Sequence, residues 1–193
     1  MPNARRKQGG NSVRIIGGVW RSRVLRFPDA TGLRPSPDRV RETLFNWLGQ
    51  DLTGLACLDL FAGSGALGFE AASRGARSVV MTEDDRAAAA ALRANAVLLD
   101  AKSWRLAAGD ALEFLRLHRA GHPGGLFDVV FLDPPFGTDL LARVMPLLPQ
   151  VLAPGARVYV ESDEALKVPE GWELLRQGKA GVVHYHLMQR VQL

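Results

Sequence analysis

Short apolar runs alternate with longer amphipathic segments from residue 55 of the chain onward. The apolar runs predict strands at 55–60, 77–83, 103–108, 126–132 and 156–161. The segments between them carry apolar residues at helical spacing and predict helices at about 65–74, 84–99, 111–119 and 138–145. Strands that alternate with helices in this way form a parallel sheet with helices on both faces.

The pattern changes near the end of the sequence. Residues 172–177 and 182–191 read as two strands joined by GKAG, with no helix between them. Such a pair forms a hairpin, so the last strand should run antiparallel to its neighbours. We therefore expect an α/β fold with a mostly parallel seven-stranded sheet and an antiparallel last strand.

The first fifty residues follow a different pattern. Residues 13–27 carry β-branched and aromatic residues around a Gly-Gly pair, which indicates a short hairpin. Ser36 is then expected to cap a helix, with Pro37 in its first position and Gly49 at its end. The chain thus divides into three predicted parts: a disordered basic tail at 1–12, a hairpin-and-helix extension at 13–50 and the main domain at 51–193.

The composition is that of an ordinary soluble domain, with 193 residues of which 47% are hydrophobic and 23% charged. No apolar run approaches the ~18–20 residues of a membrane span, and MPNARRKQGG lacks the apolar core of a secretory signal. The only cysteine, Cys57, lies in an apolar run, which indicates a packed thiol in a reducing compartment. We therefore expect a cytoplasmic protein without a metal site, since no acid or cysteine completes a set with His184 and His186.

Positive charge is concentrated at the front of the chain. Residues 1–41 hold ten Arg or Lys and two acids, a net charge of +8, whereas the whole chain carries +4. A basic front end on an acidic body favours a polyanionic partner. A solubilising tail explains the basic residues near the N-terminus, but it explains less well Arg21 and Arg23, which lie beside Trp20 among apolar residues.

A glycine-rich loop follows the first strand of the alternating region. In LDLFAGSGALG, Gly63, Gly65 and Gly68 match G-x-G-x-x-G, whose glycines permit a tight turn and close approach of a ligand to the backbone. Glu83, at the end of the next strand, is placed to accept hydrogen bonds from ribose hydroxyls. These features fit a nicotinamide cofactor, a flavin or S-adenosylmethionine and do not distinguish them.

Acidic residues lie at the ends of four successive strands, namely Asp59, Glu83, Asp110 and Asp133. Because the carboxyl ends of parallel strands share one edge, these side chains should face one cleft. Acids are also common in helix caps, but four of them beside the glycine loop indicate a binding site. The last acid begins DPPF, where two prolines stiffen the turn.

Several segments resemble a known family. The combination of D-x-FAGSG and DPPF resembles class I methyltransferases that modify exocyclic amino nitrogens. RIIGGVWRSRVLRFP, LRPSPDRVRETLFNWL, CLDLFAGSGALGFEAASRGA, LDPPF and YVES are together similar to the RsmD-type 16S ribosomal RNA guanine-N2 methyltransferases, over about residues 13–193. The resemblance implies a Rossmann-like fold and transfer of a methyl group from S-adenosylmethionine to a guanine N2 of 16S ribosomal RNA in the small subunit.

The resemblance also implies roles for individual residues. The residues expected to hold the cofactor are Gly63, Ser64 and Gly65 at the methionine end, Glu83 at the ribose, Asp110 with Ala111 at the adenine, and Asp59 at the same edge. In TEDD, Asp85 is the alternative to Glu83 for the ribose, and the strand register favours Glu83. The resemblance places Arg34 and Arg39 against RNA, and the charge of the front end adds Arg21 and Arg23 as expected RNA contacts. For Arg39, pairing with Glu42 on the helix surface is the alternative.

The DPPF turn suits this reaction. The amino group of a base is a poor nucleophile because its lone pair is delocalised into the ring. The Asp133 carboxylate and the Pro134 carbonyl are placed to accept its N–H groups and favour a localised lone pair. Phe136 offers a face on which the base can stack.

Three other functions fit parts of the sequence. A DNA adenine-N6 methyltransferase uses DPPF as well, but such enzymes usually carry a target-recognition region for which this chain has little room. A nicotinamide oxidoreductase would leave DPPF unexplained, and a non-enzymatic RNA-binding module would not require the glycine loop. The main hypothesis predicts a monomer that acts on 16S ribosomal RNA, within a partly assembled small subunit.

Overall fold

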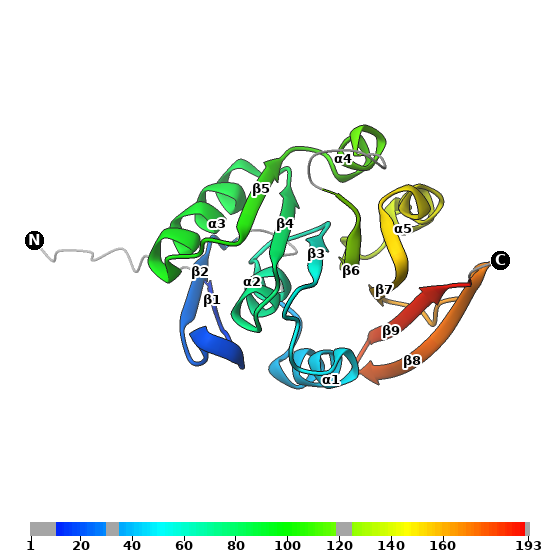
Figure 1. Cartoon of the computed structure of the whole chain (residues 1–193), viewed down its shortest axis with the longest axis horizontal. Coiled ribbons are helices and arrows are strands. Elements are labelled where there is room, and N and C mark those ends of the chain that lie inside the picture. Colours follow the sequence, from blue (N-terminus) through cyan, green and yellow to red (C-terminus); the bar gives the residue numbers. More distant parts are fainter. Residues whose placement is uncertain (1–10, 30–34, 119–124, 192–193) are drawn as a thin grey trace, which may run out of the picture.

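The protein is built around one large sheet, and the computed structural model describes residues 11–29, 35–118 and 125–191. The strands of the large sheet are β3 (Ala56–Asp59), β4 (Ser78–Glu83), β5 (Trp104–Ala108), β6 (Phe127–Leu132), β7 (Leu152–Ser162), β8 (Trp172–Ala180) and β9 (Val183–Arg190). Their order is β5-β4-β3-β6-β7-β9-β8 (Figure 1). β3 to β7 pair in parallel, whereas β9 runs antiparallel to both β7 and β8. The predicted mostly parallel sheet with an antiparallel last strand is therefore confirmed.

Helices cover both faces of this sheet. They are α1 (Asp38–Leu48), α2 (Ala66–Ser73), α3 (Arg86–Leu99), α4 (Ala111–Leu117) and α5 (Leu140–Val144), and the 3-10 helix η2 (Met145–Gln150) continues α5. A separate two-stranded sheet pairs β1 (Asn11–Arg14) with β2 (Val24–Phe27), with the 3-10 turn η1 (Gly18–Trp20) between them. None of the helices in the described part of the chain combines the length and the apolar character needed to cross a bilayer.

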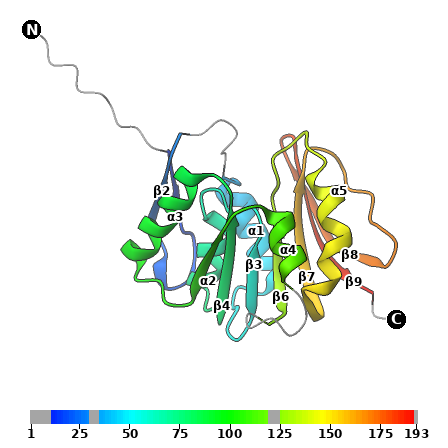
Figure 2. The same cartoon turned by 90° about the horizontal axis from the view of Figure 1, so that it is seen from above.

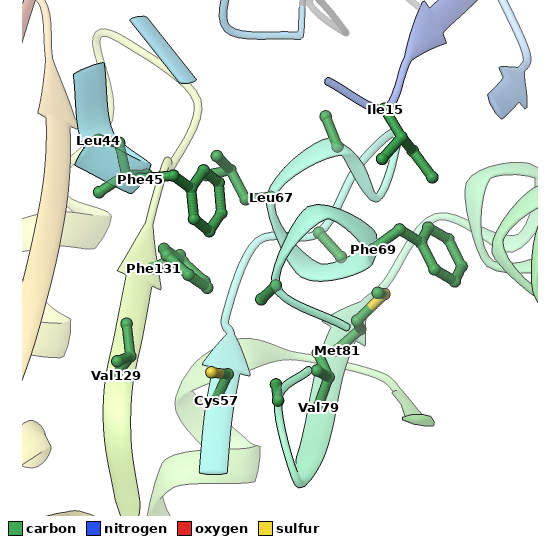
Figure 3. Packing of buried hydrophobic residues seen from close by; sticks show 14 of the residues in the cluster. Ile15, Leu44, Phe45, Cys57, Leu67, Phe69, Val79, Met81, Val129 and Phe131 are labelled. Carbon is green, nitrogen blue, oxygen red and sulfur yellow. The ribbon is translucent and has the colours of Figure 1, made fainter. Parts of the chain in front are cut away.

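Buried apolar side chains form one cluster on each face of the sheet. On one face, α1, α2, α3 and the β1–β2 hairpin pack against the strands, and on the other α4, α5 and η2 do so. Figure 3 shows the first cluster, where Phe45 of α1 lies against Phe131 of β6 with ring centroids 6.0 Å apart. β6 reads FDVVFL, almost continuously apolar, because both of its faces are covered.

A buried ionic network fixes the β1–β2 hairpin to α2. The carboxylate of Glu70 accepts hydrogen bonds from the backbone N–H groups of Ile16 at 2.8 Å and Gly17 at 2.7 Å. Arg41 of α1 and Arg74 also contact this carboxylate, at 3.3 Å and 2.9 Å. Because side chains of the hairpin also join the first apolar cluster, the N-terminal extension and the main domain share one core.

The loop of the hairpin lies at the edge where the parallel strands begin. The N–H of Trp20 donates to Ser73 Oγ at 2.9 Å, and that hydroxyl donates to the Gly17 carbonyl at 2.6 Å. Ser73 ends α2, which runs from the carboxyl end of β3 back to the start of β4. Figure 2 shows the hairpin alongside α3, at one end of the sheet, with the β8–β9 pair at the other.

The predicted start of the first helix is wrong by one position. α1 begins at Asp38, Pro37 occupies its cap position, and Ser36 makes no capping hydrogen bond. The reason is a contact made across the molecule, since the Ser36 hydroxyl donates to the buried carboxylate of Glu161.

Two other boundaries also differ. β1 begins at Asn11, so the last two residues of the predicted disordered tail form part of a strand, and residues 1–10 lie outside the described residues. β8 continues through Ala180, so three residues of GKAG extend the strand and the hairpin turns at 181–182.

Candidate active site

The glycine loop between β3 and α2 adopts the left-handed turn that its sequence predicts. Gly63 and Gly65 have φ of +49° and +78°, a region that L side chains rarely adopt. A Cβ atom on Gly65 would lie 2.6 Å from Leu92 and 2.7 Å from Phe69, so the core itself requires glycine there. A Cβ on Gly68 would lie 2.5 Å from Met81 of β4, so this glycine lets α2 pack closely on the sheet.

Asp59, the last residue of β3, lies buried beneath this loop. Its Oδ2 accepts a hydrogen bond from the N–H of Gly68 at 2.9 Å. Its Oδ1 has no hydrogen-bond partner among the described residues, although it is buried. Burial, and after it the neighbouring carboxylates of Glu83 and Glu161, raise the pKa of this carboxyl to about 7, against the lowering effect of the hydrogen bond from Gly68.

The structure separates the roles of the two acids in TEDD. Glu83 Oε2 accepts from the N–H of Gly63 at 2.7 Å and its Oε1 from the N–H of Asp85 at 2.9 Å, so this carboxylate lies against the glycine loop. Asp85 is instead the N-cap of α3, where its side chain accepts from the N–H of Ala88 at 2.7 Å. Glu83 therefore lies against the glycine loop and Asp85 caps α3, and the binding of a ribose by Glu83 stays a prediction.

Asp110 also acts as a helix cap. Its Oδ1 accepts from the N–H of Glu113 at 2.8 Å at the start of α4, and Ala111 is the buried first residue of that helix. The preceding Gly109 donates its N–H to the carbonyl of Glu83 at 2.9 Å. Asp110 is thus a helix cap, and the hydrogen bond from Gly109 to Glu83 keeps it beside the end of β4.

Asp133 and Pro134 follow directly after β6, as the sequence predicts. Asp133 is half-buried, Pro134 is buried and Phe136 is 43% exposed. Burial, then the nearby carboxylates of Glu161 and Asp59, raises the pKa of Asp133 well above its usual range. An acceptor in a poorly hydrated position and an accessible aromatic face thus lie three residues apart.

Glu161 also lies in this site. No role is predicted for it from the sequence, although it is the third residue of YVES. It is buried near the end of β7, and β6 and β7 are parallel with Leu132 opposite Val160. Asp133 and Glu161 each come one residue later, so their carboxylates are neighbours. Glu161 could have been found in the same way as the other four acids, because it too is an acid near the end of a buried strand.

Four carboxylates, of Asp59, Glu83, Asp133 and Glu161, therefore gather at one edge of the sheet. Burial is the first cause of a raised pKa in each of them. Among the described residues, no basic side chain forms an ion pair with any of these four. Such an edge favours a cationic ligand and disfavours a pyrophosphate.

The predicted RNA-contacting arginines lie in different places. Arg21 and Arg23 are exposed next to the hairpin loop, at the edge opposite the acids, and Arg23 donates to the carbonyl of Leu98 at 2.7 Å. Arg39 is exposed in the first turn of α1, and no ion pair between it and Glu42 is found in the described part of the chain. Arg34 lies outside the described residues.

Two other basic residues of the front end are paired within the protein. Arg41 is fully buried and contacts Asp38 at 2.6 Å as well as Glu70, while Arg14 contacts Asp38 at 2.9 Å. The net charge of +8 in residues 1–41 therefore overstates the positive charge that is available to a binding partner.

The family model described as Conserved hypothetical protein 95 matches residues 13–189. The chain is 46% identical over 187 residues to ribosomal RNA small subunit methyltransferase D of Escherichia coli strain K12, covering 94% of this chain and 92% of that protein. It is 44% identical over 194 residues to the Haemophilus influenzae protein of the same name, covering 97% and 96%.

Solved structures agree with these relatives. The putative methyltransferase yhhF from Escherichia coli superposes with a TM-score of 0.83 at 43% identity, covering 94% of this chain and 99% of that one. An RNA methyltransferase from Salinibacter ruber, in complex with S-adenosyl-L-homocysteine, shares the fold at a TM-score of 0.62 and 21% identity, covering 83% and 95%. The chain therefore belongs to the Conserved hypothetical protein 95 family, and it is a methyltransferase with the class I fold.

Proposed function

We propose that this enzyme transfers a methyl group from S-adenosylmethionine to the exocyclic N2 of a guanine in 16S ribosomal RNA. The observation that carries the proposal is the position of Asp133 and Pro134, at a strand end beside the glycine loop and within the cluster of carboxylates. The relatives whose names specify ribosomal RNA of the small subunit support the choice of substrate.

The acidic edge suits S-adenosylmethionine better than a dinucleotide. The cofactor supplies a methyl group on a positively charged sulfonium, and a cation favours the ionised forms of carboxyls whose pKa is raised by burial. The glycine loop at Gly63–Gly65 would hold the methionine end, Glu83 the ribose hydroxyls, and Asp110 with Ala111 the adenine. A dinucleotide would bring its pyrophosphate to an edge lined with negative charge.

Two hydrogen-bond acceptors would act together at the target amine. The Asp133 carboxylate and the Pro134 carbonyl accept the two N–H groups, which orients the amine and favours a lone pair on nitrogen. The two prolines restrict the backbone at this point, so the acceptors are positioned before the substrate arrives. The exposed Phe136 ring gives the extruded base a surface for stacking.

The N-terminal extension would carry the RNA. Arg39 lies in the first turn of α1, close in sequence to Ser36, whose hydroxyl donates to Glu161 at the edge that carries the four carboxylates. Arg34 precedes Ser36 in sequence. Arg21 and Arg23 would contact phosphates further from the target base. We expect a cytoplasmic monomer whose substrate is a partly assembled small subunit, because a basic hairpin reads shape better than a short sequence.

The experiment that tests this function is mass mapping of methylated nucleosides after reaction with small subunits that lack the modification, free 16S RNA and duplex DNA. We expect N2-methylguanine in ribosomal RNA. Preferred methylation of adenine N6 in DNA would replace the proposal with the alternative enzyme.

Asp133→Asn provides the matching variant, because it keeps the shape but loses the negative acceptor. We expect a rate loss of ~100-fold or more, which corresponds to about 3 kcal/mol of transition-state stabilisation, with cofactor affinity nearly unchanged. Asp163→Asn changes an exposed acid beyond β7 in the same way and serves as the control. Full turnover by Asp133→Asn would show that DPPF has another role.

A further inference from the structure

Glu161 is held by two hydroxyl groups from distant parts of the chain. Tyr159 Oη donates to its Oε1 at 2.8 Å, and the Ser36 hydroxyl donates to the same oxygen. Ser36 precedes α1 and is separated from Glu161 by 125 positions in sequence. Both donors favour the ionised form of Glu161, since a carboxylate accepts two such bonds better than a carboxylic acid does.

The second oxygen of Glu161 is left for the site. Oε2 makes no hydrogen bond among the described residues, and it is not one of the fully enclosed polar atoms that lack a partner. The charged and titratable groups that face Asp133 are Glu161 and Tyr159 from β7 and Asp59 from β3. Of these, Glu161 is the one whose charge is stabilised by hydroxyl donors from two segments.

We propose that Glu161 is a positioning residue that acts through Asp133, by keeping an ionised carboxylate beside it so that Asp133 becomes a strong proton acceptor for the methylated amine. This inference rests on the proposed function. In the reaction, the N2 lone pair forms the new N–C bond while the C–S bond breaks and leaves its electron pair on sulfur. The sulfonium becomes a neutral thioether, the nitrogen becomes cationic, and its N–H proton passes to the Asp133 carboxylate.

The basicity of Asp133 follows from its neighbour. A like charge disfavours ionisation, so an ionised Glu161 makes Asp133 hold a proton more tightly than an isolated carboxylate would. A base with a higher pKa accepts a proton more readily, provided that the pH leaves it ionised. Ser36 and Tyr159 contribute by lowering the pKa of Glu161 against the effect of its burial, so that Glu161 loses its proton before Asp133 does and stays ionised while Asp133 accepts the proton of the amine.

The test compares Glu161→Gln with wild type over a range of pH. Gln has nearly the same shape and still accepts from the two hydroxyls through its carbonyl oxygen, but it carries no charge. We expect the acidic limb of kcat/KM for RNA to move to lower pH by about one unit. We also expect kcat at neutral pH to fall about three- to tenfold, with the affinity for S-adenosylmethionine within about twofold of wild type.

Two further variants separate charge from structure. Glu161→Asp keeps the charge, so its acidic limb should stay near that of wild type. Glu164→Gln removes an equivalent charge from an exposed position three residues later and should leave the profile unchanged. An unshifted limb in Glu161→Gln, with or without a loss of thermal stability, would overturn the proposal.

A titration of the free enzyme gives a readout that does not depend on the substrate. Carboxyl carbons of Asp133 and Glu161, followed by ¹³C NMR, should titrate as a coupled pair in wild type, and Asp133 should titrate at lower pH in Glu161→Gln. Independent titration of the two groups in wild type would refute the coupling even if Glu161→Gln did not fold. If wild type methylates no guanine N2 while the coupling is present, the proposed function fails and the pairing of these carboxyls stands.

Discussion

Replacing Asp59 by Asn should make the ligand-free protein more stable relative to wild type as the pH rises. The pKa of Asp59 is raised from an ordinary value of 3.8 to about 7 in the folded protein. The folded state therefore binds a proton that the unfolded chain has already released between these values. The stability that Asp59 contributes is fully present below about pH 4 and is lost as the pH rises to about 7. A shift of about 3 pKa units at about 1.4 kcal/mol each amounts to about 4 kcal/mol.

The variant lacks this titration and pays a different cost. An Asn side chain can still accept from Gly68, but its amide would occupy the position of Oδ1, which has no partner among the described residues. An unsatisfied buried donor costs about 1–3 kcal/mol at every pH. The stability of Asp59→Asn minus that of wild type should therefore begin negative near pH 4 and increase by about 4 kcal/mol towards pH 8.

Urea denaturation at pH 5, 6, 7 and 8, in the absence of ligands, measures this difference, of which about 3 kcal/mol should develop between pH 5 and pH 8. Asp163→Asn, at an exposed acid, should show no such dependence. Adding S-adenosylmethionine should stabilise wild type more than Asp59→Asn, because the cation offsets the charge that Asp59 contributes. A difference between Asp59→Asn and wild type that stays constant, or that shrinks as the pH rises, would refute the assignment of the buried charge.

Three other variants test the scaffold and the RNA surface. Glu70→Gln should lower the free energy of unfolding by about 3 kcal/mol, because Arg41 loses a buried charged partner, and chemical denaturation measures it; a loss below about 1 kcal/mol would contradict this. Gly65→Val should yield little folded protein by circular dichroism, since a Cβ alone would lie within 2.7 Å of core side chains; a folded variant would be inconsistent with the packing. Arg21→Ala combined with Arg23→Ala should flatten the salt dependence of RNA affinity by about one to two log units per log unit of salt, measured by filter binding; an unchanged slope would remove the hairpin loop from the interface.

The strand ends were predictable because their signals are local. A buried parallel strand is a short apolar run, and the residue that ends the run must lie at the carboxyl edge of the sheet. Asp59, Glu83 and Asp133 could therefore be placed together from the sequence. The glycine loop was found for the same reason, although the sequence did not reveal that Gly65 and Gly68 are needed by the core as well as by the turn.

The contacts made between distant segments could not be predicted. Ser36 has the chemistry of a helix cap and stands at the correct position, but a buried carboxylate 125 residues away binds its hydroxyl instead. Arg41 counted as part of a basic surface, yet it is buried. A signal for this was present, since Arg41 lies three and four residues before Leu44 and Phe45, on the apolar side of α1. Charge summed over a segment does not distinguish such a residue from an exposed one.

The position of β9 has a consequence for how the chain is synthesised. β9 lies between β7 and β8, and in the large sheet β8 pairs only with β9. When β8 leaves the ribosome it therefore has no neighbour to join, and the edge of β7 stays open as a template for strands of other chains until residues 183–190 emerge. A nascent chain stopped before residue 183 would lack not one strand of the native sheet but two.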